Sequence, residues 1–450
     1  MASGHTGRRA VEHDPVSAGS ELRLRRELIS LLLLVAAAAC YVGIVAVRQG
    51  PPSGGDTVPL TAVSSAVGAG DLRAAAAVSS LPNPPGYALW TAPFVAAFPS
   101  WLGAPAWCTT HQRAAAIRQG ASFRRDPALA LGLDECEMAT TVGAAALPPW
   151  YRSQGVLGVG SWLVLAVGGL ALLRAARADT VARQAGLLAF LAFLPAASSA
   201  IVQLYHPQDI VSLGLALGAL ALTLRRRWAW AGVAFGAAVL TKQFAVLLLL
   251  PALVAARDRR ARSALGGVAA LVFAAGLLPF LVVEPRATLE NLSGFSAGGA
   301  TAGQTVLTLL GVTGTVASAV ARDAPLVFAA AVCLWIDRRP ESHPEHPVTL
   351  VALALVCAGS RLVFESVVFP YYLLAASVLI FLLDLVARRS PHRSLAWCAA
   401  AAFFVAFRPG NRAVDAIGTL LLAVAAVVAG WVELSPSSTA VLPAGAGEAT

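Results

Sequence analysis

The chain has 450 residues, of which 57% are hydrophobic and 13% are charged. Soluble globular chains carry about a quarter charged residues, so this composition, with a mean hydropathy of +0.71, excludes a soluble domain. The net charge of +9 does not indicate a nucleic-acid partner, because the arginines lie in short clusters between apolar segments, as they do in membrane proteins. We predict an all-α polytopic helix bundle with the lipid bilayer as a partner.

Apolar runs between charged, proline and glycine breaks predict about twelve membrane spans, within a range of roughly eleven to thirteen. The first run, Leu28–Val47, follows three arginines and lacks a convincing cleavage site, so we expect a retained signal anchor. The runs at 229–241 and 244–256 are short for upright spans, which leaves broken helices as an alternative. The predicted helices are 28–47, 155–174, 185–204, 209–224, 229–241, 244–256, 264–283, 316–336, 347–368, 371–387, 394–407 and 414–433.

The first span is followed by a long segment, residues 48–154, that we predict to be an outer loop. Its stretch 86–106, GYALWTAPFVAAFPSWLGAPA, has the prolines and tryptophans of an interfacial or re-entrant helix. Counting this stretch as a span would place the later arginine clusters outside, against the positive-inside rule. Cys108 and Cys136 lie in the same loop, where a disulfide and free thiols are both open.

Basic residues indicate the orientation. With the N-terminus in the cytoplasm, most of the 33 Lys and Arg residues fall on the cytoplasmic side. We therefore predict a multi-pass protein of a bacterial inner (plasma) membrane. Residues 1–22 and 434–450 are rich in Ser, Gly, Pro and Ala, which favours disordered tails around one transmembrane domain, residues 23–433.

Ionisable groups near or within membrane spans are costly and therefore mark candidate functional positions. Asp56 follows the first span in QGPPSGGDTVPL, at a Pro/Gly turn near the outer surface; a solvated turn carboxylate is the alternative. Further on, the junction QLYHPQD places His206 and Asp209 before an apolar run. The two side chains are candidates to bind a polar ligand, although Asp209 equally suits the N-terminal end of a helix.

Lys242 is the only lysine among the 33 basic residues, so this position has a lysine although the composition of the chain strongly favours arginine. It lies with Gln243 in LTKQF, between two apolar segments on the predicted outer side. An ammonium group there is suited to hold a phosphate. Chance retention of the lysine is the alternative.

Arg361 and Glu365 are spaced i, i+4 in SRLVFESVVFPYYL, which ends in Tyr371 and Tyr372. This spacing lets the two charges pair on one helix face. A structural ion pair and a substrate role, with arginine on a lipid phosphate, are both open. The sequence contains no Walker A, HExxH, CxxC or Rossmann glycine motif, which argues against an ATP-driven pump and predicts no metal site.

The order of these features resembles the GT-C-type membrane glycosyltransferases, in particular the bacterial mannosyltransferase-like enzymes that use polyprenyl-phosphate sugars. The layout covers most of the chain: a first span, an acidic residue soon after it, a long outer loop and then closely spaced helices. Its most specific stretch runs from HPQD through the RRRWAW cluster to TKQF and ARDRR.

The resemblance implies transfer of a sugar, mannose-like by preference, from a polyprenyl-phosphate donor to an envelope glycan, lipid or protein on the outer face. Transfer would proceed with inversion, and Asp56 matches the position of the general base. Lys242 or Arg361 would hold the phosphate. The implied substrate-binding residues are His206, Asp209, Lys242, Gln243, Arg361, Glu365 and Tyr372.

The chain departs from the family pattern in the first outer loop. Asp56 has no acidic neighbour, and Asn83 precedes Pro84 and Pro85 where the family often has a tyrosine. Other acids of the loop are therefore alternative bases, namely Asp71, Asp126, Asp134, Glu135 and Glu137. No cofactor is predicted, and a divalent-metal requirement is left open. The alternative function is a secondary transporter or flippase of lipid-linked sugars, which would show inverted repeats and paired charges at midplane.

Overall fold

A computed structural model describes residues 15–48, 57–77, 84–97, 149–202, 206–293, 305–312, 314–365, 368, 370–406 and 412–435. Within these ranges the chain forms helices and no strand element, which confirms the predicted all-α membrane fold. Asp56, Asn83, Cys108 and Cys136 lie outside the described residues.

Most of the bundle is made of long apolar helices. The long helices are α1 (Pro15–Arg48), α8 (Pro149–Ala175), α11 (Pro207–Leu224), α14 (Arg259–Val283), α17 (Gly314–Asp337), α18 (Pro347–Phe364) and α21 (Arg412–Glu433). The shorter members are α9 (Val181–Phe193), α10 (Pro195–Val202), α12 (Trp228–Thr241), η2 (Gln243–Ala245), α13 (Val246–Ala255), η3 (Pro370–Tyr372), α19 (Leu373–Val386) and α20 (His392–Ala406). Small helices outside the bundle are α2 (Thr57–Gly68), α3 (Leu72–Ala77), α4 (Gly86–Ala97), α15 (Pro285–Ser293) and α16 (Val306–Leu309).

Each predicted span coincides with one or two of these helices, but fewer are long enough to cross a membrane alone. In the described part of the chain, seven helices meet the length and hydropathy of a span, and the pair α9 and α10 makes up to eight. That pair is bent by 47° because Pro195 begins a new helix after Leu194, so the continuous helix predicted at 185–204 is wrong. Helices α12, α13 and α19 are apolar but shorter than a full span, so the number of spans stays a prediction.

Two predicted boundaries differ from the structure. Helix α1 begins at Pro15, inside the stretch 1–22 that was expected to be a disordered tail. Helix α18 ends at Phe364, because Glu365 takes an extended conformation at its C-cap. Helix α4 covers Gly86–Ala97 of the predicted interfacial stretch, and residues 98–106 of that stretch lie outside the described part of the chain.

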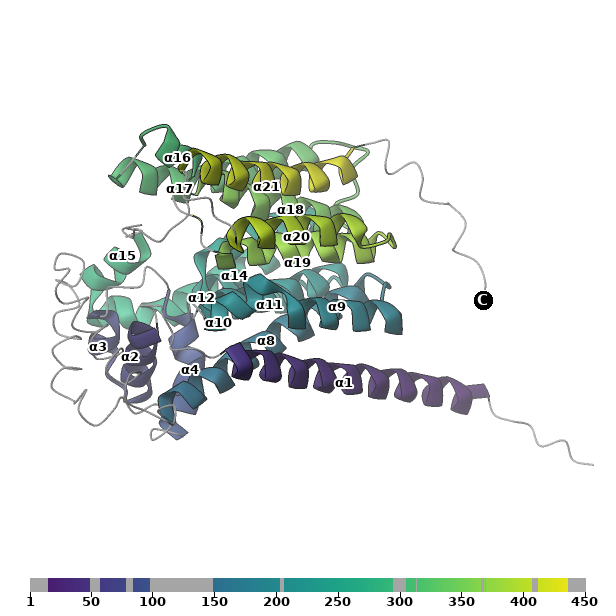
Figure 1. The fold of residues 1–450 in the computed structure, drawn as a ribbon, viewed down its shortest axis with the longest axis horizontal. Coiled ribbons are helices and arrows are strands. Elements are labelled where there is room, and N and C mark those ends of the chain that lie inside the picture. The colour runs from purple at the N-terminus through teal and green to yellow at the C-terminus, as the bar shows by residue number, and fades with distance from the viewer. Residues whose placement is uncertain are drawn as a thin grey trace, which may run out of the picture.

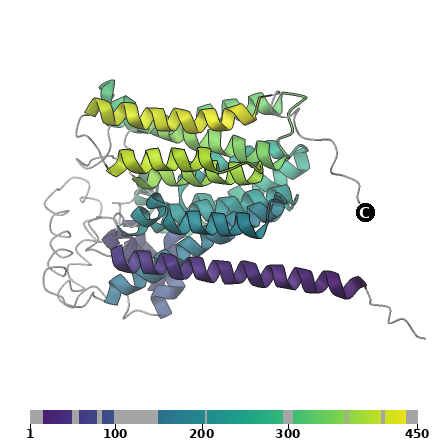
Figure 2. The ribbon, with the colours of Figure 1, turned by 45° about the vertical axis from the view of Figure 1, so that its right-hand side comes forward.

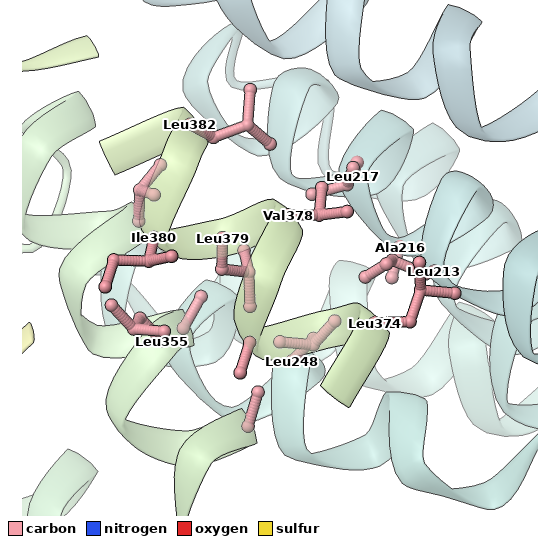
Figure 3. Close-up of a cluster of buried hydrophobic side chains, with 14 of the residues drawn as sticks. Leu213, Ala216, Leu217, Leu248, Leu355, Leu374, Val378, Leu379, Ile380 and Leu382 are labelled. Carbon is pink, nitrogen blue, oxygen red and sulfur yellow. The ribbon is translucent and has the colours of Figure 1, made fainter. Parts of the chain in front are cut away.

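The helices lie side by side in a bundle with its core between α11, α13, α18 and α19 (Figures 1 and 2). Figure 3 shows Leu213 and Leu217 of α11 facing Leu374 and Val378 of α19. Helix α19 is buried along almost its whole length. A helix that is apolar on all sides is stable at the centre of a bundle, which explains how fourteen residues form a helix here.

Glycines let pairs of helices approach until their backbones touch. A Cβ added to Gly214 of α11 would lie 2.6 Å from the backbone of Leu165 in α8. On α12, Gly232 and Gly236 would each place a Cβ 2.6 Å from a carbonyl oxygen of α14. Small residues spaced by four positions are typical of close helix packing in membranes.

Several arginine salt bridges lie at one end of the bundle, which we call the arginine end. They are Arg174 with Glu27, Arg257 with Glu345, Arg262 with Asp337, Arg389 with Glu433 and Arg393 with Asp384. The small helices α2, α3 and α15 lie at the opposite end, which we call the loop end (Figure 1). The first residues of α1 and the last residues of α21 lie at the arginine end (Figure 1). The fold thus separates the basic clusters from the long first loop.

Candidate functional site

Helix α11 begins at the loop end with the predicted polar junction. Pro207 occupies the first position after His206, where a missing N–H costs nothing. Asp209 lies in the first turn, where the helix dipole favours a carboxylate. The sequence therefore starts the helix here, and the two side chains face one another: Nδ1 of His206 is 3.6 Å from Oδ2 of Asp209.

Lys242 reaches the same carboxylate from the next helix. Helix α12 ends at Thr241, and Lys242 at its C-cap is extended, with φ −155° and ψ 128°. Its Nζ lies 3.5 Å from Oδ2 of Asp209, and the side chains are only 13% and 4% exposed. Ser212 of α11 donates to the carbonyl oxygen of Ala238 at 2.9 Å, which ties the two helix ends together. The ammonium is thus held in a largely dry position beside a carboxylate.

Arg361 and Glu365 pair as predicted, although Glu365 lies just beyond the helix. Nη2 of Arg361 is 3.2 Å from Oε1 of Glu365, with side-chain exposures of 17% and 5%. The guanidinium also lies over two aromatic rings, 4.3 Å from the centroid of Tyr372 and 5.3 Å from that of Phe244. Cation–π contacts of this kind strengthen when water is excluded.

Aromatic rings join the two ion pairs into one cluster. The imidazole of His206 stacks on Tyr371 at 4.0 Å between centroids. Tyr371 in turn meets Tyr372 edge to face at 4.7 Å, and Tyr372 lies under Arg361. The short helix η3 thus connects the start of α11 with the end of α18. We call this group the ionic cluster: His206, Asp209, Lys242, Arg361, Glu365, Tyr371 and Tyr372.

Six of the predicted substrate-binding residues therefore come together: His206, Asp209, Lys242, Arg361, Glu365 and Tyr372. Gln243 does not join them, because its Nε2 donates to the carbonyl oxygen of Leu292 at 3.0 Å and so fastens α15. Two residues were not among the predicted site residues. Tyr371, a member of the cluster, was visible as the neighbour of Tyr372. Gln208, which lies beside the cluster with Nε2 3.0 Å from Nδ1 of His206, was part of the HPQD junction.

The ionic cluster has a defined charge. It holds two cations, Lys242 and Arg361, two carboxylates, Asp209 and Glu365, and one histidine. Buried charges persist when they are paired, and here each cation has a carboxylate partner. An anion that enters must compete with these carboxylates for the ammonium or the guanidinium. Among the described residues, no three His, Cys, Asp or Glu side chains form a group that could hold a metal ion.

The first loop docks beside this cluster. Leu60, in the first turns of α2, packs with Tyr87 of α4 and Val211 of α11. A Cβ added to Gly86 would lie 2.5 Å from the carbonyl oxygen of Leu240, so α4 rests directly on the end of α12. Helix α2 starts at Thr57, the residue after Asp56. The loop therefore meets the helix ends that carry Asp209 and Lys242.

Comparison with protein families finds one match along this part of the chain. The family model of glycosyltransferase family 87 matches residues 138–364, about half of the chain. This range contains the ionic cluster from His206 to Arg361, whereas Asp56 precedes it and Tyr372 follows it. No curated protein matches the sequence.

Proposed function

The chain belongs to glycosyltransferase family 87, a GT-C-type family of membrane glycosyltransferases that includes mannosyltransferases, and from this membership we propose its donor, acceptor and mechanism. The donor is a polyprenyl-phosphate sugar, with a mannose-like sugar favoured. The acceptor is a glycan, lipid or protein of a bacterial envelope. The loop end faces the outer side of the inner membrane, and the N-terminus lies in the cytoplasm.

The observation that supports this proposal is that four charged or titratable members of the ionic cluster lie inside the range matched by the family: His206, Asp209, Lys242 and Arg361. A lipid-linked donor reaches the enzyme from the bilayer with its phosphate at the membrane surface. Such a phosphate needs a cation held out of bulk water, where its charge acts strongly. Lys242 and Arg361 meet this condition at the end of the bundle where the first loop docks.

Asp56 serves as the general base in this mechanism. It takes the proton of the acceptor hydroxyl, whose oxygen attacks the anomeric carbon of the sugar. The bond from that carbon to the phosphate oxygen breaks, and the configuration at the anomeric carbon is inverted. The leaving polyprenyl phosphate gains one negative charge, which Lys242 or Arg361 stabilises. His206, Asp209 and Tyr372 line the sugar pocket.

Membership in a glycosyltransferase family places the chain among enzymes instead of the alternative class of transporters and flippases. The pair of Arg361 and Glu365, which suggested a transporter, lies at a helix end and not in the middle of a helix. Arg361 is in the last turn of α18, which ends at Phe364, whereas transporter sites lie near the midplane. The ion pair is therefore assigned to donor binding.

The test is transfer of radiolabelled sugar by membranes that contain the wild type or Asp56→Asn at matched protein levels. Polyprenyl-phosphate mannose and the arabinose donor are assayed in parallel. We expect the wild type to transfer and the isosteric variant to lose about a hundredfold or more, the usual contribution of a positioned base. Asp71→Asn, an exposed acid of the same loop, is the matched comparison.

The outcomes separate the donor from the base. Loss in Asp71→Asn with full activity in Asp56→Asn would move the base to Asp71. Activity in both variants would leave the remaining loop acids as candidates. Absence of transfer by the wild type with every lipid donor would refute the donor assignment.

A further inference from the structure

A cavity of about 50 Å³ lies at the loop end, between the first-loop helices and the bundle. Its walls come from α2, α3 and α4 on one side, and from α11, α12, α14 and α15 on the other. Most of the lining is apolar, and the side chains in it that carry a polar group are Tyr87, Gln208, Thr241 and Thr288. The volume is several times what one water needs, so the cavity admits the edge of a small polar ligand.

The two threonine hydroxyls already donate to backbone carbonyl oxygens. Thr241 donates to the carbonyl oxygen of Ala237 at 2.8 Å, and Thr288 donates to that of Glu284 at 2.7 Å. Each keeps only acceptor capacity for a ligand.

Gln208 differs from them, because it is fully buried and one end of its amide has no partner. Its Nε2 lies 3.0 Å from Nδ1 of His206, whereas Oε1 has no hydrogen-bond partner among the described residues. Leaving a buried polar atom unpaired destabilises the folded protein. A side chain that lines a cavity at this cost is suited to bind a ligand there.

The chemistry of the cavity favours a hydroxyl. A phosphate brings only acceptor oxygens, and the cavity lining contains no cation. A prenyl chain would leave Oε1 unpaired. A sugar hydroxyl can donate to that oxygen and accept from other groups, while the carbon face of the sugar ring packs on the apolar wall.

The cavity also lies on the side expected for the acceptor. Leu60 of α2 lines it, and α2 begins one residue after Asp56. On its other side, Gln208 contacts His206, which lies beside Asp209, the partner of Lys242 in the ionic cluster. Gln208 therefore stands between the phosphate site and the first loop.

We propose that this cavity is the subsite for a hydroxyl-bearing edge of the acceptor sugar, and that Gln208 is a residue that determines acceptor specificity. The expected change in the KM for acceptor rests on the proposed glycosyl transfer. The expected change in glycoside binding does not depend on whether the protein transfers a sugar.

The test uses two variants of the full chain and one matched control. Gln208→Leu removes the amide, and Ala76→Leu fills the cavity from α3, where Ala76 is part of the lining. The control is Gln184→Leu. Gln184 is also buried, at the arginine end, but both ends of its amide are paired: Oε1 accepts from Ser30 at 2.6 Å and Nε2 donates to the carbonyl oxygen of Asp179 at 2.9 Å.

Binding is measured first, by saturation-transfer NMR of methyl mannoside, glucoside and arabinoside on protein in nanodiscs. We expect the wild type and Gln184→Leu to bind at least one glycoside. Gln208→Leu should weaken that binding about three- to tenfold, which corresponds to one net hydrogen bond, and Ala76→Leu should abolish it. Thermal unfolding of each variant shows that it is folded.

Kinetics then separate acceptor from donor. We expect Gln208→Leu to raise the KM for acceptor and to leave the KM for polyprenyl-phosphate sugar unchanged. Glycoside binding that is unchanged in Gln208→Leu, or absent from the wild type, would overturn the inference. A raised donor KM, with weaker binding of farnesyl phosphate, would assign the cavity to the lipid chain instead. Glycoside binding without any sugar transfer would leave the subsite standing and refute the proposed donor.

Discussion

Lys242 contributes a positive charge in a place where water is largely excluded. Its Nζ lies 3.5 Å from Oδ2 of Asp209, whose side chain is 4% exposed. Such a pair is weak support for stability, because both groups lose their hydration. A hydrophobic pair of similar size would hold the helices as well. The pair between Lys242 and Asp209 is therefore not explained by stability alone, and the proposed phosphate-binding role gives the only lysine of the sequence a function.

Removing Lys242 alone should harm both folding and activity. In Lys242→Met, Asp209 becomes a buried carboxylate that has lost its ammonium partner, and breaking a buried pair typically costs about 3–5 kcal/mol. We expect a lower apparent melting temperature in detergent and loss of sugar transfer. Arg260→Met, which removes an exposed cation at the arginine end, should change neither.

The double variant Lys242→Met with Asp209→Leu separates the two effects. Both charges are then gone, so the melting temperature should return close to that of the wild type. Sugar transfer should stay lost, because no ammonium is left for the phosphate. Recovery of transfer in the double variant would show that Lys242 serves only to neutralise Asp209.

At the scale of the element, contact between helix backbones decides where the site residues lie. Helix α11 crosses α8 at Gly214, where an added Cβ would lie 2.6 Å from the backbone of Leu165. Gly218, one turn later on the same helix, has nothing within 4 Å of an added Cβ. Sequence alone does not distinguish the two glycines.

Gly214→Ala should therefore force α11 and α8 apart and destabilise the protein by about 1–3 kcal/mol, the usual cost of overpacking. Gly218→Ala should leave stability unchanged or raise it by up to about 1 kcal/mol, because alanine favours the helix. Thermal unfolding in detergent measures both. Equal effects of the two substitutions would contradict the close crossing.

Helix ends at the arginine end show a related feature. Arg177, Arg226 and Arg388 have φ of 54°, 57° and 58°, a left-handed conformation in which glycine is usual. Each follows the last turn of a helix, α8, α11 or α19. A cation there interacts favourably with the helix dipole. The chain accepts strained backbone at these positions and keeps its positive charge on one side.

For the whole molecule, the separation of the arginine end from the loop end makes the orientation testable. The positive-inside rule predicts that the arginine end faces the cytoplasm. His343, with a side chain 66% exposed, lies at the arginine end. Leu310, 71% exposed, follows α16 near the opposite end (Figure 1).

We expect a membrane-impermeant maleimide to label Leu310→Cys in intact cells and His343→Cys only after permeabilisation. Wild-type protein, which keeps its own cysteines, gives the background. The reverse pattern would invert the orientation and move the ionic cluster to the cytoplasmic side, which would exclude the proposed outer-face transfer.

Much of the fold could be predicted, because hydropathy over a span is a local property. Apolar runs and arginine clusters gave the all-α bundle and the order of the helices. The break at Pro195 and the end of α18 at Phe364 were missed, since neighbouring helices decide whether such a run stays straight. The count of spans stays a prediction for the same reason: α12, α13 and α19 are short and draw their stability from packing.

The sequence by itself determined which residues could carry chemistry. A buried charge is costly, so the few polar residues at the ends of apolar runs stand out without a structure. Only the tertiary structure decided which of them meet. It brought His206, Asp209 and Lys242 to Arg361, turned Gln243 toward Leu292, and left one amide end of Gln208 unpaired. These outcomes depend on glycine crossings and on contacts between segments far apart in the chain, which no local pattern specifies.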